Sequence, residues 1–218
     1  MVLKIFKRKD SFHSKDGIKI MDKVINNALK AYLIGPIEKT KANDAGRGWR
    51  DKLRPELELR VDENGNHLYI FDPTIEESNK IGLEPKEFHK KIKGWIAAGN
   101  NDLISEYTNL IWHGKSYLEK TDTADREKLI HVMGDIDYTV KSNFLICRIE
   151  EGDNPCGTYF ECGIALEHKI PIYVLQTMTR DNYPVSFVGA VFATGGQFFD
   201  NPTQLLEFVD KTYKLKVK

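Results

Sequence analysis

The chain has 218 residues, enough for one sizeable domain, and its 41% apolar and 29% charged content is ordinary for a folded globular protein. Thirty-two basic residues balance thirty-two acidic ones, so there is no overall basic footprint for duplex nucleic acid. No apolar run approaches the ~20 residues of a membrane span, and residues 1–6 are too short for a signal-peptide core, so we expect an intracellular, cytoplasmic protein.

Cysteine and histidine are few and irregularly spaced. The three cysteines show no C-x-x-C spacing, and the six histidines show no H-x-x-x-H spacing. We therefore expect no metal site, no disulfide framework and no other cofactor. Cys147 lies inside an apolar run and is expected in the core. Cys156 and Cys162 flank a turn and are expected to pack there, with a reactive thiol as the alternative.

The first predicted strand ends in a glycine. Residues 15–30 carry apolar side chains at helical spacing, and residues 31–34 form a short apolar run that predicts a buried strand. Gly35 allows the backbone to approach a ligand closely, and Pro36 ends the strand. A glycine-containing segment at residues 44–50 follows. This order is similar to a phosphate-binding loop, but it matches neither the dinucleotide nor the P-loop motif.

The second strand follows a helix. A four-residue repeat from Trp49 to Leu57 predicts that helix, which Pro55 is expected to break or kink. The apolar run at residues 68–71 predicts the next strand. Residues 84–98 then carry an apolar stripe that predicts another helix.

Two aspartates lie on a predicted helix that leads into the third strand. Apolar residues recur there at helical spacing at Leu129, Met133, Ile136 and Val140. This spacing places Asp135 and Asp137 on the helix. The two carboxylates are either solvated on a polar face or part of a site.

The most informative segment joins two apolar strands, at residues 143–149 and 170–175, through a glycine-containing loop and a short helix. The loop places Glu161 in the first turn of the helix, near the carboxyl ends of the strands, where open α/β sheets bind ligands. A carboxylate there can act as a nucleophile. The alternative is a capping box, in which Thr158 caps the helix and Glu161 bonds back to the cap amide.

The C-terminal part predicts two further elements. Residues 187–192 are apolar and predict a last edge strand, and residues 202–214 predict a closing amphipathic helix. No repeat, low-complexity tract or linker divides the chain. We therefore expect one α/β domain, residues 1–218, with a mainly parallel sheet and helices on both faces.

Taken in this order, these elements resemble the nucleoside 2-deoxyribosyltransferase-like family, which includes deoxynucleoside monophosphate N-glycosidases. The resemblance covers roughly residues 31–73 and 128–200. Its Gly-Thr-x-x-Glu element is moderately specific, and the order of all seven segments adds to that. The segments are residues 32–37, Trp49-Arg50, Phe71-Asp72-Pro73, Asp135, residues 144–149, residues 157–165 and residues 170–175.

The resemblance implies a Rossmann- or flavodoxin-like fold and a carboxylate-based mechanism. Glu161 would be the nucleophile, and Asp135 would protonate the leaving base. Asp137 takes that place if the register differs by two. The implied substrate-binding residues are Gly35, Pro36, Arg50, Asp72, Asp137, Gly157 and Thr158.

The implied activity is 2-deoxyribosyl transfer between bases by a homo-oligomer, with a nucleoside or nucleotide and a free base as small-molecule partners. A deoxynucleoside 5′-monophosphate hydrolase and a catalytically inactive nucleotide-binding or interaction module are the alternatives. Residues 1–30 and about 74–127 depart from the compact family pattern, as an N-terminal extension and an insertion. The insertion is expected to be largely helical and to lie over the strand ends, although residues 102–119 show no clean period.

Overall fold

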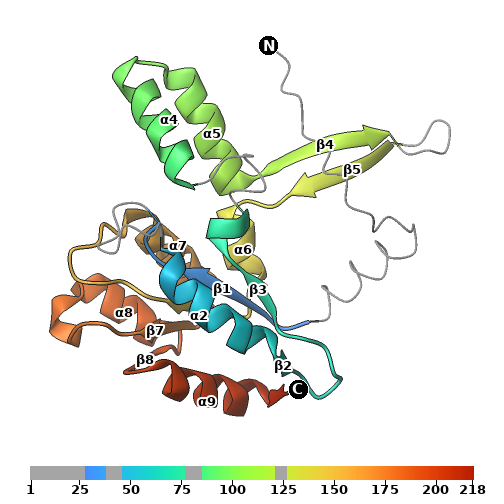
Figure 1. Cartoon of the computed structure of the whole chain (residues 1–218), viewed down its shortest axis with the longest axis vertical. Coiled ribbons are helices and arrows are strands. Elements are labelled where there is room, and N and C mark those ends of the chain that lie inside the picture. Colours follow the sequence, from blue (N-terminus) through green and yellow to red (C-terminus); the bar gives the residue numbers. More distant parts are fainter. Residues whose placement is uncertain (1–27, 38–45, 77–84, 121–126) are drawn as a thin grey trace.

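The computed structural model describes residues 28–37, 46–76, 85–120 and 127–218 (Figure 1). Five strands form one parallel sheet in the order β3-β1-β6-β7-β8. They are β1 (Lys30–Ile34), β3 (Tyr69–Phe71), β6 (Phe144–Cys147), β7 (Ile172–Leu175) and β8 (Gln197–Phe199). The predicted α/β fold is confirmed. The helix predicted at residues 15–30 lies outside the described residues, apart from its last three positions.

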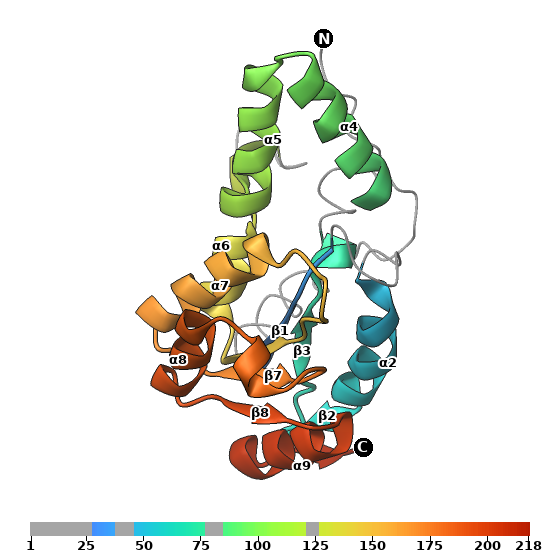
Figure 2. The same cartoon turned by 90° about the vertical axis from the view of Figure 1, so that its left-hand side faces the viewer.

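Helices cover both faces of the sheet (Figure 2). The core contacts place α2 (Arg47–Glu58) and α9 (Pro202–Tyr213) on one face, and α6 (Asp135–Lys141), α7 (Cys156–Glu167) and α8 (Val185–Ala193) on the other. Successive strand residues point to opposite faces, so Tyr32 and Ile34 join the core under α6 to α8, whereas Ala31 and Leu33 join the core under α2 and α9. The central strands are therefore apolar along their length.

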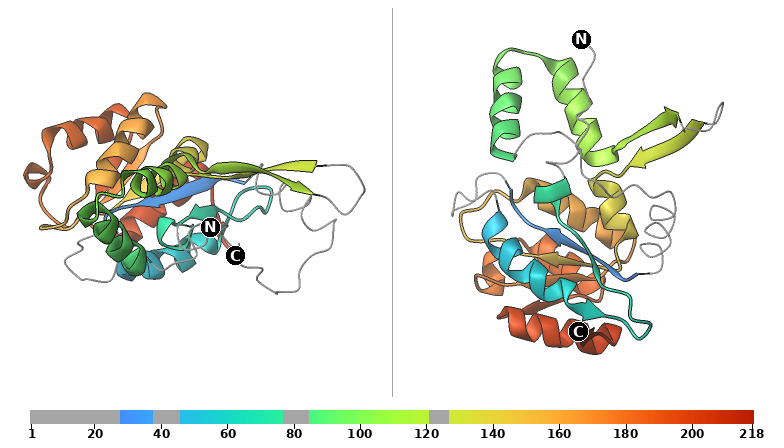
Figure 3. Two further views of the ribbon diagram at one scale, coloured as in Figure 1. Left: turned by 90° about the horizontal axis from the view of Figure 1, so that it is seen from above. Right: turned by 45° about the vertical axis from the view of Figure 1, so that its right-hand side comes forward.

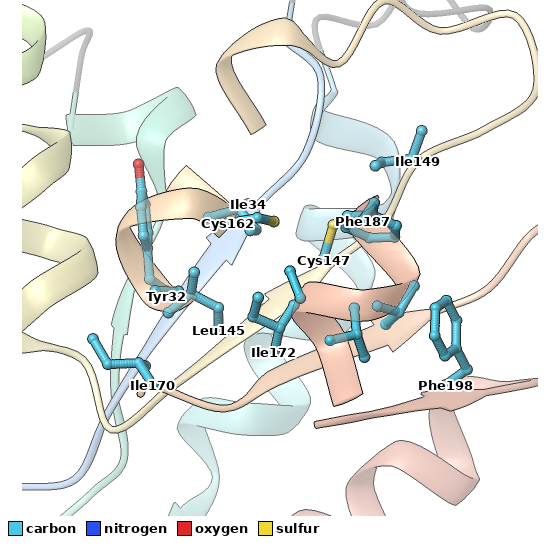
Figure 4. Packing of buried hydrophobic residues seen from close by; sticks show 14 of the residues in the cluster. Tyr32, Ile34, Leu145, Cys147, Ile149, Cys162, Ile170, Ile172, Phe187 and Phe198 are labelled. Carbon is cyan, nitrogen blue, oxygen red and sulfur yellow. The ribbon is translucent and has the colours of Figure 1, made fainter. Parts of the chain in front are cut away.

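The core under α7 and α8 fixes these helices to the sheet (Figure 4). Leu145 and Cys147 of β6 pack in one cluster with Cys162 of α7, and Ile172 of β7 and Phe187 of α8 belong to the same cluster. None of these five residues is more than 3% exposed. Burying one large apolar side chain contributes about 1.5–3 kcal/mol. The helix that carries Glu161 is thus held rigidly against the strands.

The strand order changes direction between β1 and β6. After β1, the chain forms β3 on one side of β1. It then crosses over and forms β6 on the other side of β1. Ile34 and Cys147, the last residues of β1 and β6, are register partners. Ligands of open parallel sheets bind outside the carboxyl ends of the strands at such a switch point. The residues that follow Ile34 and Cys147 therefore lie where a ligand is expected.

The insertion forms a helix pair and a β-hairpin that project from the sheet (Figures 1 and 3). The helix pair is α4 (Pro85–Ala97) and α5 (Asn101–His113), and the hairpin is β4 (Lys115–Lys120) with β5 (Glu127–Val132), which follows at the end of the insertion. In Figure 3, α4 and α5 stand beyond the end of the sheet at which β1 and β3 terminate. The helix predicted at residues 84–98 is confirmed.

No helix in the described ranges is long and apolar enough to span a membrane.

The helical spacing at Leu129 and Met133 was misleading. Leu129 lies in β5, which pairs antiparallel with β4, and the aspartate helix α6 begins only at Asp135. The long-range pairing of the hairpin overrides the local period, as is common for short apolar runs. The ambiguous residues 102–119 divide between α5 and β4. The described part of the insertion therefore contains two helices, up to His113, and ends in the strand β4.

The edge strand predicted at residues 187–192 is instead part of helix α8. Phe187, Ala190 and Val191 are its buried residues, which is helical spacing. A short apolar run does not by itself distinguish a buried strand from a buried helix. The strand at this edge of the sheet is β8, which begins four residues after the end of α8.

Pro55 does not interrupt helix α2, contrary to the expectation. It lies inside Arg47–Glu58, on the exposed side of the helix. Leu53 and Leu57 are buried on the sheet on either side of it. This packing outweighs the loss of one backbone hydrogen bond at Pro55.

The two ends of the β-hairpin arm meet at a pair of glycines. A methyl group on Gly134 would overlap the carbonyl oxygen of Trp112 and the backbone nitrogen of Gly114. We expect Gly134→Ala to lower the free energy of unfolding by about 1–3 kcal/mol, because backbone atoms cannot move aside cheaply. Urea denaturation followed by circular dichroism measures this.

The matched control for Gly134→Ala is Gly163→Ala. Gly163 is exposed on helix α7, and no atom lies within 4 Å of an added Cβ. Alanine there should raise stability by up to about 1 kcal/mol, because it favours the helix. Equal stabilities for the two variants would contradict the close contact at Gly134.

Candidate active site

The carboxyl ends of the two central strands are in close backbone contact. The Arg148 amide donates to the Ile34 carbonyl at 3.2 Å. A Cβ atom on Gly35 would lie 2.5 Å from the Arg148 carbonyl oxygen, and Gly35 has a φ of 157°. Any side chain at position 35 would force the strand ends apart. Glycine is therefore required at this turn by the neighbouring strand end, and the predicted close approach of Gly35 to a ligand stays a prediction.

Arg50 holds the turn that follows β1. Its side chain is completely buried. Nη2 donates to the carbonyl of Gly35 at 2.9 Å, Nη1 donates to the carbonyl of Gly46 at 2.7 Å, and Nε and Nη2 approach the carbonyl of Leu33 at 3.4 and 3.3 Å. The guanidinium is therefore engaged by backbone carbonyls around Gly35. The structure places Arg50 as a positioning residue for the turn, and Pro36 is buried beside it.

Asp72 lies directly after β3 and is almost completely buried. Its Oδ1 accepts hydrogen bonds from the Thr74 amide at 3.0 Å and from the Thr74 hydroxyl at 2.7 Å. Arg50 Nε lies 3.8 Å from the same oxygen, and Arg54 Nη1 lies 3.9 Å from Oδ2. Asp72 thus starts the turn after β3 and balances the charge of Arg50. The predicted contact of Asp72 with a sugar or base stays a prediction.

Glu161 is a buried carboxylate that bonds across to the sheet. It is 7% exposed, and its Oε1 accepts a hydrogen bond from the Tyr32 hydroxyl at 2.7 Å. Tyr32 belongs to β1, and Figure 4 shows its hydroxyl pointing out of the apolar cluster. The hydroxyl orients the carboxylate and stabilises its negative charge.

The capping-box alternative for Glu161 is wrong. Helix α7 begins at Cys156, and Pro155 occupies the cap position. Thr158 is therefore the third residue of the helix, and Glu161 lies in its second turn rather than its first. The helix starts three residues earlier than the motif suggested, so Glu161 is not needed to cap it.

Helix α6 brings Asp135 to the same edge of the sheet. This helix precedes β6 and packs against α7, so its first residue lies at the carboxyl ends of the strands. Asp135 is that first residue and is 5% exposed. The alternative that Asp135 is a solvated surface carboxylate is therefore wrong.

Asp137 has a helix-capping role. Its Oδ2 accepts a hydrogen bond from the Gly134 amide at 3.2 Å, and its Oδ1 lies 3.6 Å from Lys141 Nζ. The carboxylate is partly exposed. Such contacts stabilise the start of α6. Of the two aspartates, Asp135 is therefore the better candidate for a chemical role.

Aromatic side chains connect Glu161 to the neighbouring elements. Tyr138 of α6 contacts the rings of Tyr32 at 5.8 Å and Phe71 at 4.7 Å. Its hydroxyl donates to Glu76 Oε2 at 3.3 Å. Burial, and then the Glu76 carboxylate, raise the pKa of Tyr138 well above its ordinary value, so it remains a donor. Sequence reasoning missed Tyr32, Tyr138 and Glu76. Of these three residues, only Tyr32 had a signal in the sequence, since its alternation with Leu33 in the predicted strand places the two side chains on opposite faces of the sheet.

The first turn of α7 leaves space in front of the helix. Gly157 is exposed, and no atom lies within 4 Å of an added Cβ, whereas Thr158 is buried. Their predicted substrate contacts stay predictions.

Cys147 and Cys162 are buried as expected, and their mutual hydrogen bond together with burial raises the pKa of the Cys162 thiol. Cys162 is therefore a packing residue, while Cys156 is exposed.

Comparisons with known proteins give a distant structural likeness. No protein-family model matches the chain, and no curated protein matches it. Its fold is similar to the crystal structure of a conserved protein from Enterococcus faecalis V583, with 15% sequence identity and a TM-score of 0.46. The likeness covers 85% of this chain and 99% of that chain. It is too distant to support a functional assignment.

Within the described ranges, no group of three or more metal-binding side chains occurs.

Proposed function

We propose that this protein cleaves the N-glycosidic bond of a nucleoside or nucleotide and transfers the 2-deoxyribosyl group to a second base. One observation carries the proposal. A buried carboxylate, Glu161, is held by the Tyr32 hydroxyl at 2.7 Å, in a helix that begins at the carboxyl ends of the strands beside the switch point. A rigid, oriented carboxylate in that place suits covalent catalysis on a sugar.

The proposed reaction has two balanced steps. In the first, a Glu161 oxygen attacks the anomeric carbon, the C–N bond breaks, and its electron pair leaves with the base. Protonation of that base assists the departure, and the sugar remains as an ester on Glu161. In the second step, a nitrogen of the incoming base attacks the same carbon, gives its proton back to the group that protonated the leaving base, and releases the Glu161 carboxylate. Water in place of the second base gives the hydrolase.

Tyr32 is a positioning residue in this proposal. We expect Tyr32→Phe to lower kcat about 10- to 100-fold, because one hydrogen bond to a charged group is worth about 1.5–3 kcal/mol. Steady-state kinetics with a deoxynucleoside donor measures the effect, with KM little changed. Tyr173→Phe is the control, since it also removes a tyrosine hydroxyl bond, the 3.0 Å contact with Tyr213, on the opposite face of the sheet. Equal kcat values for the two variants would contradict this role.

Asp135 is proposed to protonate the leaving base. We expect Asp135→Asn to lower turnover by roughly 10²- to 10³-fold, less than a loss of the nucleophile, because general acid catalysis contributes in that range. Donors with poor leaving bases should suffer most, which a series of donor bases measures. Asp137→Asn should cost only about 0.5–1 kcal/mol of stability through the cap of α6. A uniform loss across all donor bases would exclude Asp135 as the acid.

The proposal is tested by incubating purified protein with deoxynucleosides, deoxynucleoside 5′-monophosphates and free bases, and following the products by chromatography. Exchange of one base for another supports the transferase. Release of base without exchange indicates the hydrolase, and saturable binding without turnover indicates an inactive binding module. Either of the last two outcomes would contradict the proposed transferase activity.

A further inference from the structure

An aromatic contact joins the insertion to the helix that carries Glu161. Trp112, in the last turn of α5, packs its ring against the ring of Phe160 in α7, with the centroids 6.0 Å apart and the planes at 80°. Phe160 is 68% exposed, more than any other phenylalanine among the described residues. An edge-to-face contact covers only part of each ring. Uncovered aromatic surface therefore lies one residue before the buried carboxylate.

The backbone of Trp112 lies at the start of helix α6. A Cβ atom on Gly134 would be 2.3 Å from the Trp112 carbonyl oxygen, and Gly134 directly precedes Asp135. Figure 2 shows the corresponding end of α5 next to α6 and α7. Trp112 thus adjoins the residue before Asp135 through its backbone and the residue before Glu161 through its ring. The aromatic pair lies beside both helices that carry the candidate carboxylates.

Open space adjoins the aromatic pair at the start of α7. Phe160 and Glu161 are three and four residues after Gly157, so the three residues lie on one side of the helix. Gly157 is exposed, and no atom lies within 4 Å of an added Cβ. The missing side chain leaves room one turn before Phe160 and Glu161. A flat ring in this room can stack on Phe160 while a group bonded to it reaches Glu161.

We propose that Trp112 and Phe160 bind the base of the substrate, so that the insertion selects which base reacts. This inference rests on the proposed function and names base-recognition residues for the same site. Every base has an aromatic face, and stacking on a protein ring requires no hydrogen-bond match. Because the two planes are nearly perpendicular, a base that stacks on one ring meets the other ring edge-on. The second ring of a purine extends the stacked area, so the pair favours purines over pyrimidines.

Isothermal titration calorimetry of the full chain tests the inference. The titrants are 2′-deoxyadenosine, 2′-deoxycytidine and their 5′-monophosphates, and all variants carry Glu161→Gln, because turnover would add its own heat. We expect the deoxyadenosine compounds to bind more tightly than the deoxycytidine compounds. Phe160→Leu and Trp112→Leu should each weaken the binding of deoxyadenosine compounds about 5- to 100-fold, as the loss of one stacking ring does. Phe160→Tyr keeps the ring and should keep the affinity.

The matched control is Phe192→Leu. Phe192, in α8, is another exposed phenylalanine, but its ring contacts Phe198 rather than Trp112. Its loss should leave all affinities unchanged, and circular dichroism shows that each variant is folded. An affinity of Phe160→Leu or Trp112→Leu equal to that of Phe192→Leu would overturn the inference. Absence of binding of all four compounds would also overturn it.

Failure of this inference and failure of the proposed function give different results. Base exchange by the wild type, together with an unchanged KM for purine donors in Phe160→Leu, would keep the transferase and reject the aromatic site. Binding that depends on Phe160 and Trp112, without base exchange by the wild type, would keep the aromatic site and reject the transferase.

Discussion

Glu161→Gln is expected to abolish nearly all turnover, by a factor on the order of 10⁴ or more, because loss of a nucleophile has effects of this size. The amide has the shape of the carboxylate, and its oxygen can still accept the 2.7 Å hydrogen bond from Tyr32. It cannot form the sugar ester, because it lacks the negative charge. The melting temperature should therefore move by only a few degrees, while initial rates of base exchange or base release collapse.

The matched control for this substitution is Glu167→Gln. Glu167 is the last residue of the same helix and is exposed. The Glu167→Gln substitution makes the same chemical change away from the switch point, so the variant should exchange or release base at the wild-type rate. Full activity per folded molecule in Glu161→Gln would show that Glu161 is only a structural residue.

Arg50→Met is expected to have the largest effect on stability, a loss of about 3–5 kcal/mol, in line with other buried ionic groups from which one partner is removed. The substitution leaves the carbonyls of Gly35 and Gly46 without their buried donor and leaves the Asp72 carboxylate without its nearest cation. Such a loss is a large share of the free energy of unfolding of a typical protein, which is about 5–15 kcal/mol. Urea denaturation monitored by tryptophan fluorescence measures it.

Arg54→Met provides the comparison for Arg50. Arg54 lies one turn further along α2, is 28% exposed, and pairs with Glu58 at 2.5 Å and more distantly with Asp72 at 3.9 Å. Because these pairs are partly solvated, its loss should cost about 1 kcal/mol or less. A smaller loss for Arg50→Met than for Arg54→Met would contradict the assignment of Arg50 as the residue that holds the turn.

The fold could be predicted where local pattern and burial agree. The central strands are covered on both sides, so they appear in the sequence as uninterrupted apolar runs such as residues 144–147. The β-hairpin arm could not be predicted, because its strands are defined by pairing with each other. The apolar run of α8 failed for a related reason, since burial alone does not set a period of two or of 3.6.

The candidate site was only partly visible in the sequence. A motif and a strand context predicted Glu161 and Asp135 as candidates, and both are buried; their chemical roles stay predictions. The contacts of Arg50 with the Gly35 and Gly46 carbonyls could not be predicted, because a guanidinium that binds a ligand and one that binds backbone carbonyls look the same in the sequence; its predicted contact with substrate stays a prediction. Tyr32 was missed because its partner, Glu161, lies 129 positions away along the chain. Contacts of this kind come from topology rather than from local sequence.

Trapping the sugar on the protein tests the nucleophile most directly. The full chain is incubated with a 2-fluoro deoxynucleoside analogue, whose fluorine slows breakdown of the sugar ester, and is then digested for peptide mass mapping. The account predicts one added fluorosugar per chain, on the peptide that contains Glu161, and none in Glu161→Gln. A label on any other side chain would contradict the account, as would turnover of the natural substrate by Glu161→Gln at the wild-type rate.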